Sequence, residues 1–93
     1  MKLGAVTQQP AERMSYSFQY QEALDPDETL SDTTVSVDPD GELVVESVVT
    51  LATHLQFWVT GGVDRKRYKV SATVTTSSGR VFQDELLISI RDI

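Results

Sequence analysis

The most informative part of the sequence comprises Phe57-Trp58-Val59-Thr60-Gly61-Gly62, Tyr68-Lys69-Val70 and Thr75-Thr76-Ser77-Ser78-Gly79-Arg80. Hydrophobic and polar side chains alternate in its first two pieces, which is typical of half-buried β-strands. Gly61-Gly62 predicts a loop, and Ser78-Gly79 predicts a tight turn into a further strand. The segment therefore predicts three consecutive strands, and none of its residues indicates a catalyst.

The same period of two occurs elsewhere in the chain. The alternating stretches are residues 16–20, 34–37, 55–59, 68–75 and 82–90. Leu43 to Val49 is a nearly continuous β-branched run that fits either one bulged strand or two short ones. Asp38-Pro39-Asp40-Gly41 predicts a turn, because proline presets its second position and glycine tolerates positive φ. Six or seven short strands with regular turn signals are the pattern of a β-sandwich.

The length of the chain limits it to one domain. It has 93 residues, whereas a typical domain has about 100–150. Residues 1–13 show no sustained period, so we expect a flexible N-terminal arm there and a sandwich domain over residues 14–93. A domain of this size buries only about 60–65% of its unfolded surface. Because there is no cysteine for disulfides, we expect oligomerisation or docking into a larger assembly to add stability.

The charge balance argues against two classes of partner. The chain has 14 acidic and 8 basic residues, a formal net charge of -6. Nucleic-acid binding depends on basic side chains that neutralise phosphates, and anionic membranes also attract basic segments. No apolar run approaches the roughly 20 residues of a transmembrane helix. Met1 to Val6 lacks the long apolar core of a secretory signal. We expect neither nucleic acid nor a membrane as a partner.

Residues suited to catalysis or metal binding are sparse. The single histidine, His54, has no predicted partner and cannot form a zinc site alone. There is no Gly-x-Ser-x-Gly nucleophile motif. We predict no catalytic residue, no metal and no cofactor.

Most acidic residues lie in turn-like segments. These are Asp25, Asp27, Glu28, Asp32, Asp38 and Asp40. Their spacing does not match a calcium loop, so we expect mainly solvated turn residues, with partner contacts as the alternative. We expect Arg80 to pair with Asp84 or Glu85 at the start of the last strand.

Trp58 and a basic loop are the best candidates for contacts with a partner. Trp58 has the opposite parity to Phe57 and Val59, so it points outward if those two are in the core. Exposed tryptophan is a frequent interface anchor; a bulge would instead make Trp58 the core tryptophan. The loop Val63-Asp64-Arg65-Lys66-Arg67 suits an acidic partner surface, although it also fits a solvated hairpin tip.

The order and spacing of these elements resemble the phage fiber-tail adaptor proteins, small proteins of tailed bacteriophages. The matching elements span about residues 10–90 and are Tyr16-Ser17-Phe18-Gln19-Tyr20, Leu24, Glu28-Thr29-Leu30-Ser31, Phe57-Trp58-Val59-Thr60-Gly61-Gly62, Tyr68, Val70, Thr75-Thr76 and Gly79-Arg80. The chain departs from the family pattern at Arg65-Lys66, where a glycine is frequent. It also departs at Asp84-Glu85, where the pattern has an arginine.

The resemblance implies an immunoglobulin-like sandwich that connects the tail, portal or neck to fibers or spikes. Its partners would be portal, adaptor, tail or fiber proteins of the virion, contacted by several copies in a symmetric assembly. The location would be the tail or neck of the virion, after synthesis in the bacterial host cytoplasm.

Two alternatives stay open. One is a capsid decoration protein, bound to the major capsid protein on the capsid surface. The other, more distant, is a carbohydrate-binding module in which Trp58 and Tyr68 form a sugar platform. For an adaptor, exposed strand edges and the arm would add to or pack against a neighbouring sheet. The expected contact residues are Trp58, Arg65, Lys66, Arg67, Gln8, Gln9, Pro10 and Arg13.

Overall fold

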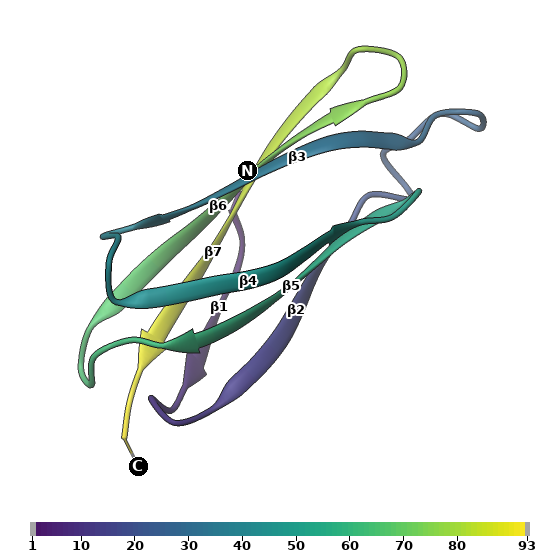
Figure 1. Cartoon of the computed structure of the whole chain (residues 1–93). Coiled ribbons are helices and arrows are strands. Elements are labelled where there is room, and N and C mark those ends of the chain that lie inside the picture. The colour runs from purple at the N-terminus through teal and green to yellow at the C-terminus, as the bar shows by residue number, and fades with distance from the viewer. Residues whose placement is uncertain (1, 93) are drawn as a thin grey trace.

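The computed structural model describes residues 2–92 and consists of strands and their connections (Figure 1). The strands are β1 (Lys2–Gln8), β2 (Arg13–Gln19), β3 (Leu30–Asp38), β4 (Leu43–Thr50), β5 (His54–Gly61), β6 (Arg67–Thr76) and β7 (Val81–Ile90). In this part of the chain we find no helix with the length and apolarity needed to cross a membrane. The prediction of an all-β protein with about seven strands is confirmed.

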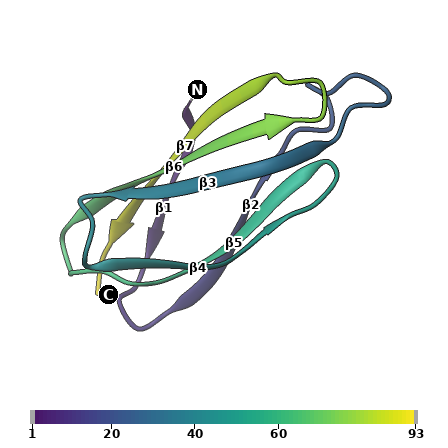
Figure 2. The ribbon, with the colours of Figure 1, turned by 45° about the horizontal axis from the view of Figure 1, so that its top comes forward.

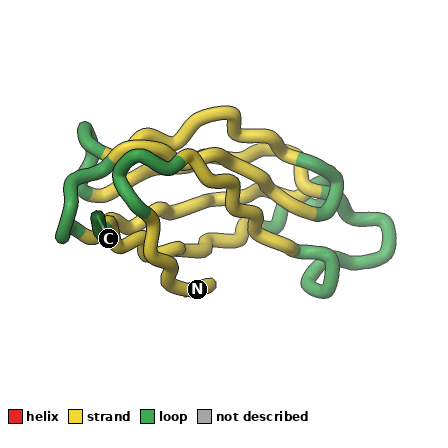
Figure 3. Tube along the Cα trace, turned by 90° about the horizontal axis from the view of Figure 1, so that it is seen from below, coloured by secondary structure: helices red, strands yellow, loops and turns green. Residues whose placement is uncertain are grey.

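The strands form two sheets that pack as layers (Figure 2). One has the order β1-β7-β6-β3 and the other the order β2-β5-β4. Neighbouring strands are antiparallel, apart from β1, which runs parallel to β7. These neighbours are those of an immunoglobulin sandwich, in which the second, fifth and fourth strands face the third, sixth and seventh. The connections gather at the two ends of the strands (Figure 3).

The core follows from the alternation along the strands, because successive side chains point to opposite faces. On β5, Leu55, Phe57 and Val59 have no exposed surface. The ring of Phe57 meets that of Phe18 edge-on, with 5.4 Å between centroids. The inward residues of the facing sheet include Tyr68, Val70, Ala72, Val74, Leu86, Ile88 and Ile90. Burying a large apolar side chain contributes about 1.5–3 kcal/mol, so this layer is the main source of stability.

The β-branched run forms one bulged strand, β4. Its register against β5 shifts between Glu46 and Val49, and Ser47 has a φ of 53°. An extra residue in one strand increases the local twist and leaves that residue unpaired. The turn predicted before β4 is also confirmed, since β3 ends at Asp38 and β4 begins at Leu43.

The structure corrects the expectation of an arm at residues 1–13. Lys2–Gln8 forms β1, which pairs with β7 along the edge of the four-stranded sheet. The alternation is obscured there by Gly4 and by a register shift between Lys2 and Gly4, so sequence periodicity could not reveal this strand. Val6 packs partly buried against the core, and β1 is therefore part of the sandwich. Met1 lies outside the described residues.

Candidate functional site

Trp58 lies on the outer face of the three-stranded sheet. Its chain neighbours Phe57 and Val59 are fully buried, whereas Trp58 is partly exposed. Directly opposed residues of antiparallel strands share a face, so Ser15 of β2 and Glu46 of β4, which pair with Trp58, mark the same outer surface. Of the two positions that the sequence left open, the structure shows the outward one, and Phe57 fills the core.

The exposed side of Trp58 is covered by Arg13. The guanidinium carbon of Arg13 lies 4.3 Å from the centroid of the Trp58 ring, within the range of a cation–π interaction. The Nε of Arg13 also donates a 2.7 Å hydrogen bond to Oε1 of Glu46. The ion pair spans from one edge strand to the other, over β5. We call Arg13 and Glu46 together the clasp, because they cover part of a tryptophan ring that would otherwise be more exposed.

Apolar side chains on β4 extend this surface. Val44 and Val49 are 48% and 45% exposed. They pair with Thr60 and Gln56, which share the outer face with Trp58. We call the surface formed by Arg13, Val44, Glu46, Val49 and Trp58 the Trp58 face. An apolar strip with an aromatic centre and a charged rim has the composition of a protein interface.

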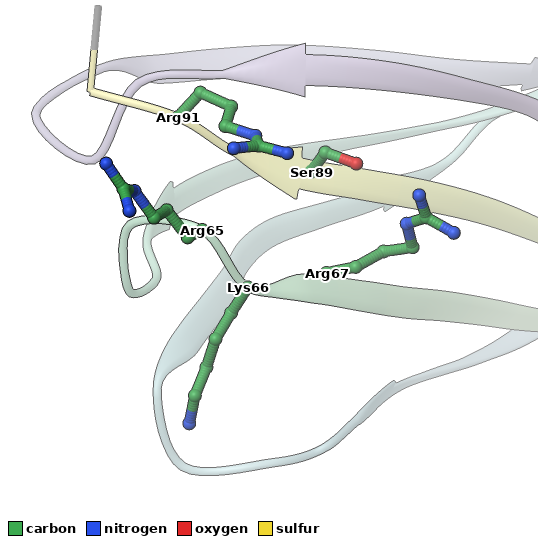
Figure 4. A pocket seen from close by; sticks show the side chains of 5 residues that line it. All are labelled: Arg65, Lys66, Arg67, Ser89 and Arg91. Carbon is green, nitrogen blue, oxygen red and sulfur yellow. The ribbon is translucent and has the colours of Figure 1, made fainter.

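A second surface lies at the end of the molecule, around the β5–β6 loop. It is an open hollow of about 300 Å³ lined by Arg65, Lys66, Arg67, Ser89 and Arg91. We call it the arginine hollow. Figure 4 shows that Arg91, which sequence analysis missed, joins Arg67 beside Ser89, while the side chain of Lys66 points away from them. The Nζ of Lys66 instead donates a 3.1 Å hydrogen bond to Glu42.

The loop that carries Arg65 is tied to the last strand. The backbone N–H of Arg65, at a φ of 69°, donates a 2.7 Å hydrogen bond to the carbonyl of Ile90. The N–H of Ile90 returns a 2.9 Å bond to the carbonyl of Lys66. The N–H of Asp92 donates to the Asp64 carboxylate at 2.9 Å. These bonds hold Arg65 close to the C-terminal end of β7, where Arg91 follows.

Tyr68 fixes the start of β6 beneath the same loop. Its ring is fully buried, its hydroxyl accepts the N–H of Val63 at 2.9 Å, and the same hydroxyl donates to Glu42 at 2.9 Å. Burial raises the pKa of Tyr68. The hydrogen bond from Tyr68, and then that from Lys66, lowers the pKa of Glu42. A tyrosine that bonds back to the preceding corner is a feature of immunoglobulin-like sandwiches.

Gln8 belongs to the interior. It is 1% exposed, and its amide nitrogen donates to the carbonyls of Glu12 and Val59, each at 3.0 Å. Its amide oxygen accepts a 2.7 Å hydrogen bond from the Tyr16 hydroxyl. The structure thus removes Gln8 from the accessible candidates for partner contact, because these bonds hold its side chain inside the sandwich.

The other candidates near the N-terminus lie at the turn into β2. Gln9 and Pro10 are partly exposed. The backbone N–H of Gln9 donates a 2.7 Å hydrogen bond to the Glu12 carboxylate, and the N–H of Glu12 donates to the carbonyl of Gln9 at 3.1 Å. Arg13 follows directly as the first residue of β2. These residues therefore form a closed turn beside the Trp58 face.

One acidic turn residue, Glu28, is not solvated as expected. Its side chain is 2% exposed and forms an ion pair with Arg80. The hydroxyls of Thr76 and Ser78 and the N–H of Asp25 also donate to its carboxylate. The bonds from Arg80, then Ser78 and Thr76, hold the pKa of Glu28 far below its ordinary value. The prediction that Arg80 pairs with Asp84 or Glu85 is wrong, and the Glu28 cluster instead joins two loops.

Asp84 faces the core rather than a basic residue. It is 2% exposed, and its carboxylate lies beside the Tyr20 hydroxyl. Burial, followed by the Asp84 carboxylate, raises the pKa of Tyr20. The Tyr20 ring stacks on Phe82, with 5.6 Å between the ring centroids.

The single histidine, His54, is partly exposed and pairs with Gln19 on the outer face of the three-stranded sheet.

Sequence similarity links the chain to one protein family. No curated protein matches it. The model of one family, described as podophage GP4 fiber-tail adaptor protein gp77, matches residues 8–89. The match includes both candidate surfaces except Arg91 and contains β2 to β6 in full. It therefore shows that this chain belongs to the podophage GP4 fiber-tail adaptor protein family.

Proposed function

We propose that this protein connects the tail or portal of a virion to its fibers or spikes, through contacts with other virion proteins. The observation that carries the proposal is the family match over residues 8–89. The polar groups of the interior form hydrogen bonds within the fold, and the surface carries exposed apolar and cationic side chains. This distribution suits a protein that assembles with others.

The positions of the two candidate surfaces support a connecting role. The Trp58 face is the outer side of the three-stranded sheet. Arg67 alternates with the buried Tyr68 and pairs with Ser89, so it belongs to the outer side of the four-stranded sheet. An adaptor must hold two neighbours at once, and surfaces on opposite layers allow this without overlap.

We assign the main affinity to the Trp58 face and the orientation to the arginine hollow. Tryptophan and arginine at the centre of an interface carry much of the binding energy. Charges at a rim contribute mainly to the rate and register of association. Several copies on a symmetric tail would turn individually weak contacts into a stable attachment.

The carbohydrate-binding alternative loses its platform in this structure. Tyr68 has no exposed surface, so its ring does not lie beside Trp58 for stacking on a sugar. The capsid-decoration alternative predicts a different place in the particle and is decided by the following experiment.

An electron cryo-microscopy reconstruction of the intact virion, without imposed icosahedral symmetry, tests the proposal. We expect density for this sandwich at the tail or neck, in contact with fiber bases. Density spread over the capsid would replace the proposal with the decoration role, and absence from the virion would refute both.

A variant pair tests the role of the Trp58 face. Phage that carry Trp58→Ala should assemble heads with few or no fibers attached, whereas Val81→Ala should leave fiber attachment unchanged. Val81 is a fitting control because it is 62% exposed but lies on β7. Normal fiber attachment in the Trp58→Ala particles would rule out this surface as the docking site.

A further inference from the structure

One end of the sandwich carries a group of exposed carboxylates. The connection between β2 and β3 exposes Glu22, Asp25 and Asp27. The fourth acidic residue of that connection, Glu28, is buried and neutralised by Arg80. We call Glu22, Asp25 and Asp27 the acidic loop. Within residues 2–92, no ion pair joins these carboxylates to a basic side chain, although Asp25 lies close enough to Arg80 to attract it electrostatically.

The arginine hollow carries the opposite charge. Among the described residues, no carboxylate pairs with Arg67 or Arg91. Arg65 lies 3.9 Å from Asp64, and its side chain is 82% exposed. Guanidinium groups gathered around one hollow repel one another unless an anion lies between them. Their planar donor pattern matches carboxylates, which accept two parallel hydrogen bonds.

The two charged surfaces lie at opposite ends of an elongated molecule. The acidic loop is tied to the β6–β7 hairpin, because the N–H of Ser77 donates to the carbonyl of Thr29. The arginine hollow is tied to the other end of β7 through Arg65 and Ile90. The molecule is 44 Å long and about half as wide, with extents of 44 × 21 × 20 Å. One copy therefore cannot neutralise its own arginines with its own acidic loop (Figure 1).

We infer that copies of this chain associate end to end, with the acidic loop of one copy in the arginine hollow of the next. Three exposed carboxylates would face three guanidinium groups, and the same contact would repeat from copy to copy. Such a heterologous contact closes into a ring or continues as a filament, depending on the rotation between copies. The inference deepens the proposed function by naming a second copy of the chain as a partner. It rests on that function only for the location of the ring, which would surround the tail.

Sedimentation velocity of the whole chain tests the inference directly. We expect association that rises with protein concentration in about 20 mM salt and disappears in about 500 mM salt, because exposed charges are screened. The double variant Arg67→Glu/Arg91→Glu and the double variant Asp25→Lys/Asp27→Lys should each raise the dissociation constant about tenfold or more. A protein that stays monomeric in low salt, or variants that associate like the native chain, would overturn the inference.

Mixing the two variants provides the decisive control. The first has acidic groups at both ends and the second has basic groups at both ends, so an equimolar mixture should associate more strongly than either variant alone. The control Asp38→Lys/Asp40→Lys has the same change in net charge but leaves the acidic loop intact. It alters exposed residues of the β3–β4 turn, at the end that carries the arginine hollow, and it should not weaken association. A mixture that remains monomeric would also refute the contact.

A folding control and a milder substitution make every outcome of the test interpretable. Circular dichroism verifies that each variant is folded, and Arg67→Gln/Arg91→Gln replaces the reversed arginines if they disturb the fold. Failure of end-to-end association with tail density still present would refute this inference alone. Association without tail density would refute the adaptor role alone.

Discussion

Arg80 of the β6–β7 hairpin pairs with Glu28, which lies 52 positions earlier in the chain and is almost completely buried. A further hydrogen bond joins Arg80 to the carbonyl of Ala23 at 2.9 Å. The hairpin and the β2–β3 connection are therefore fastened by one arginine. This contact holds the acidic loop in place at its end of the sandwich.

Replacing Glu28 with Gln should destabilise the protein and loosen this end. The amide keeps the shape but removes the charge that Arg80, Ser78 and Thr76 satisfy, so a buried network loses its centre. We expect a melting temperature lower by several degrees in a thermal scan. Asp27→Asn, one residue away and exposed, is the matched control and should have little effect. Equal melting temperatures for Glu28→Gln and the native protein would show that the network is dispensable.

Glu28 should also make stability dependent on pH. Its pKa in the folded protein is far below its ordinary value, whereas in the unfolded chain a glutamate titrates near 4.3. A group with a depressed folded pKa stabilises the fold above its unfolded pKa, and the contribution disappears as pH falls toward the folded value. Urea denaturation between about pH 7 and pH 2.5 should show a decline below about pH 4–5. The decline should be shallower in Glu28→Gln, and identical profiles would contradict the assignment.

Tyr68→Phe should lower the free energy of unfolding while the sandwich stays folded. It leaves the N–H of Val63, which forms a part-buried hydrogen bond, without its acceptor and removes a donor to Glu42. A hydrogen bond of this kind contributes about 0.5–1.5 kcal/mol. Glu42→Gln keeps the bond from Val63 and should cost less, which separates the two contributions. Urea denaturation provides the comparison, and an equal or larger loss for Glu42→Gln would point to the carboxylate instead.

Gly62→Ala should be more harmful than Gly41→Ala. Both glycines have positive φ, 90° and 97°, so alanine suffers backbone strain at either site. At Gly62 a Cβ would also lie 2.7 Å from Cγ1 of Ile90 and 3.1 Å from Cδ1 of Leu43, whereas at Gly41 nothing lies within 4 Å. Overpacking adds about 1–3 kcal/mol, which chemical denaturation of the two variants should resolve. Equal losses would mean that Ile90 moves aside freely.

The residues show which features could be predicted from the sequence. Period-two alternation identified the inward side chains of β5, but it left the position of Trp58 open between the outer face and the core. The edge strand β1 was missed because a glycine and a register shift break its alternation, and because its only described apolar side chain in contact with the core is that of Val6. Edge strands bury little, so they leave a weak hydrophobic pattern.

Features of the candidate site that depend on a single strand could be predicted from the sequence. Contacts that depend on how strands and loops pair with one another could not. Arg13 covers Trp58 only because β2 and β5 pair in a particular register. Arg80 has Asp84 and Glu85 close in sequence, yet its partner comes from a distant loop. Arg91 could have been found by counting residues outward from the Ser77–Gly79 turn, which brings β7 back beside the basic loop. Contacts set by register and loop closure have no local sequence signal.

Trp58 is the single tryptophan of the chain, so its fluorescence reports on the clasp formed by Arg13 and Glu46. Arg13→Ala removes both the cation over the ring and the ion pair, each of which contributes about 1 kcal/mol or less at an exposed site. We expect a small loss of stability but a clear increase in quenching of Trp58 by acrylamide, because one face of the ring becomes accessible. Glu46→Gln should give an intermediate increase, since it frees the guanidinium without removing it. Arg67→Ala, on the other sheet, should leave quenching unchanged. Equal quenching in the native protein and Arg13→Ala would mean that the guanidinium does not cover the ring in solution.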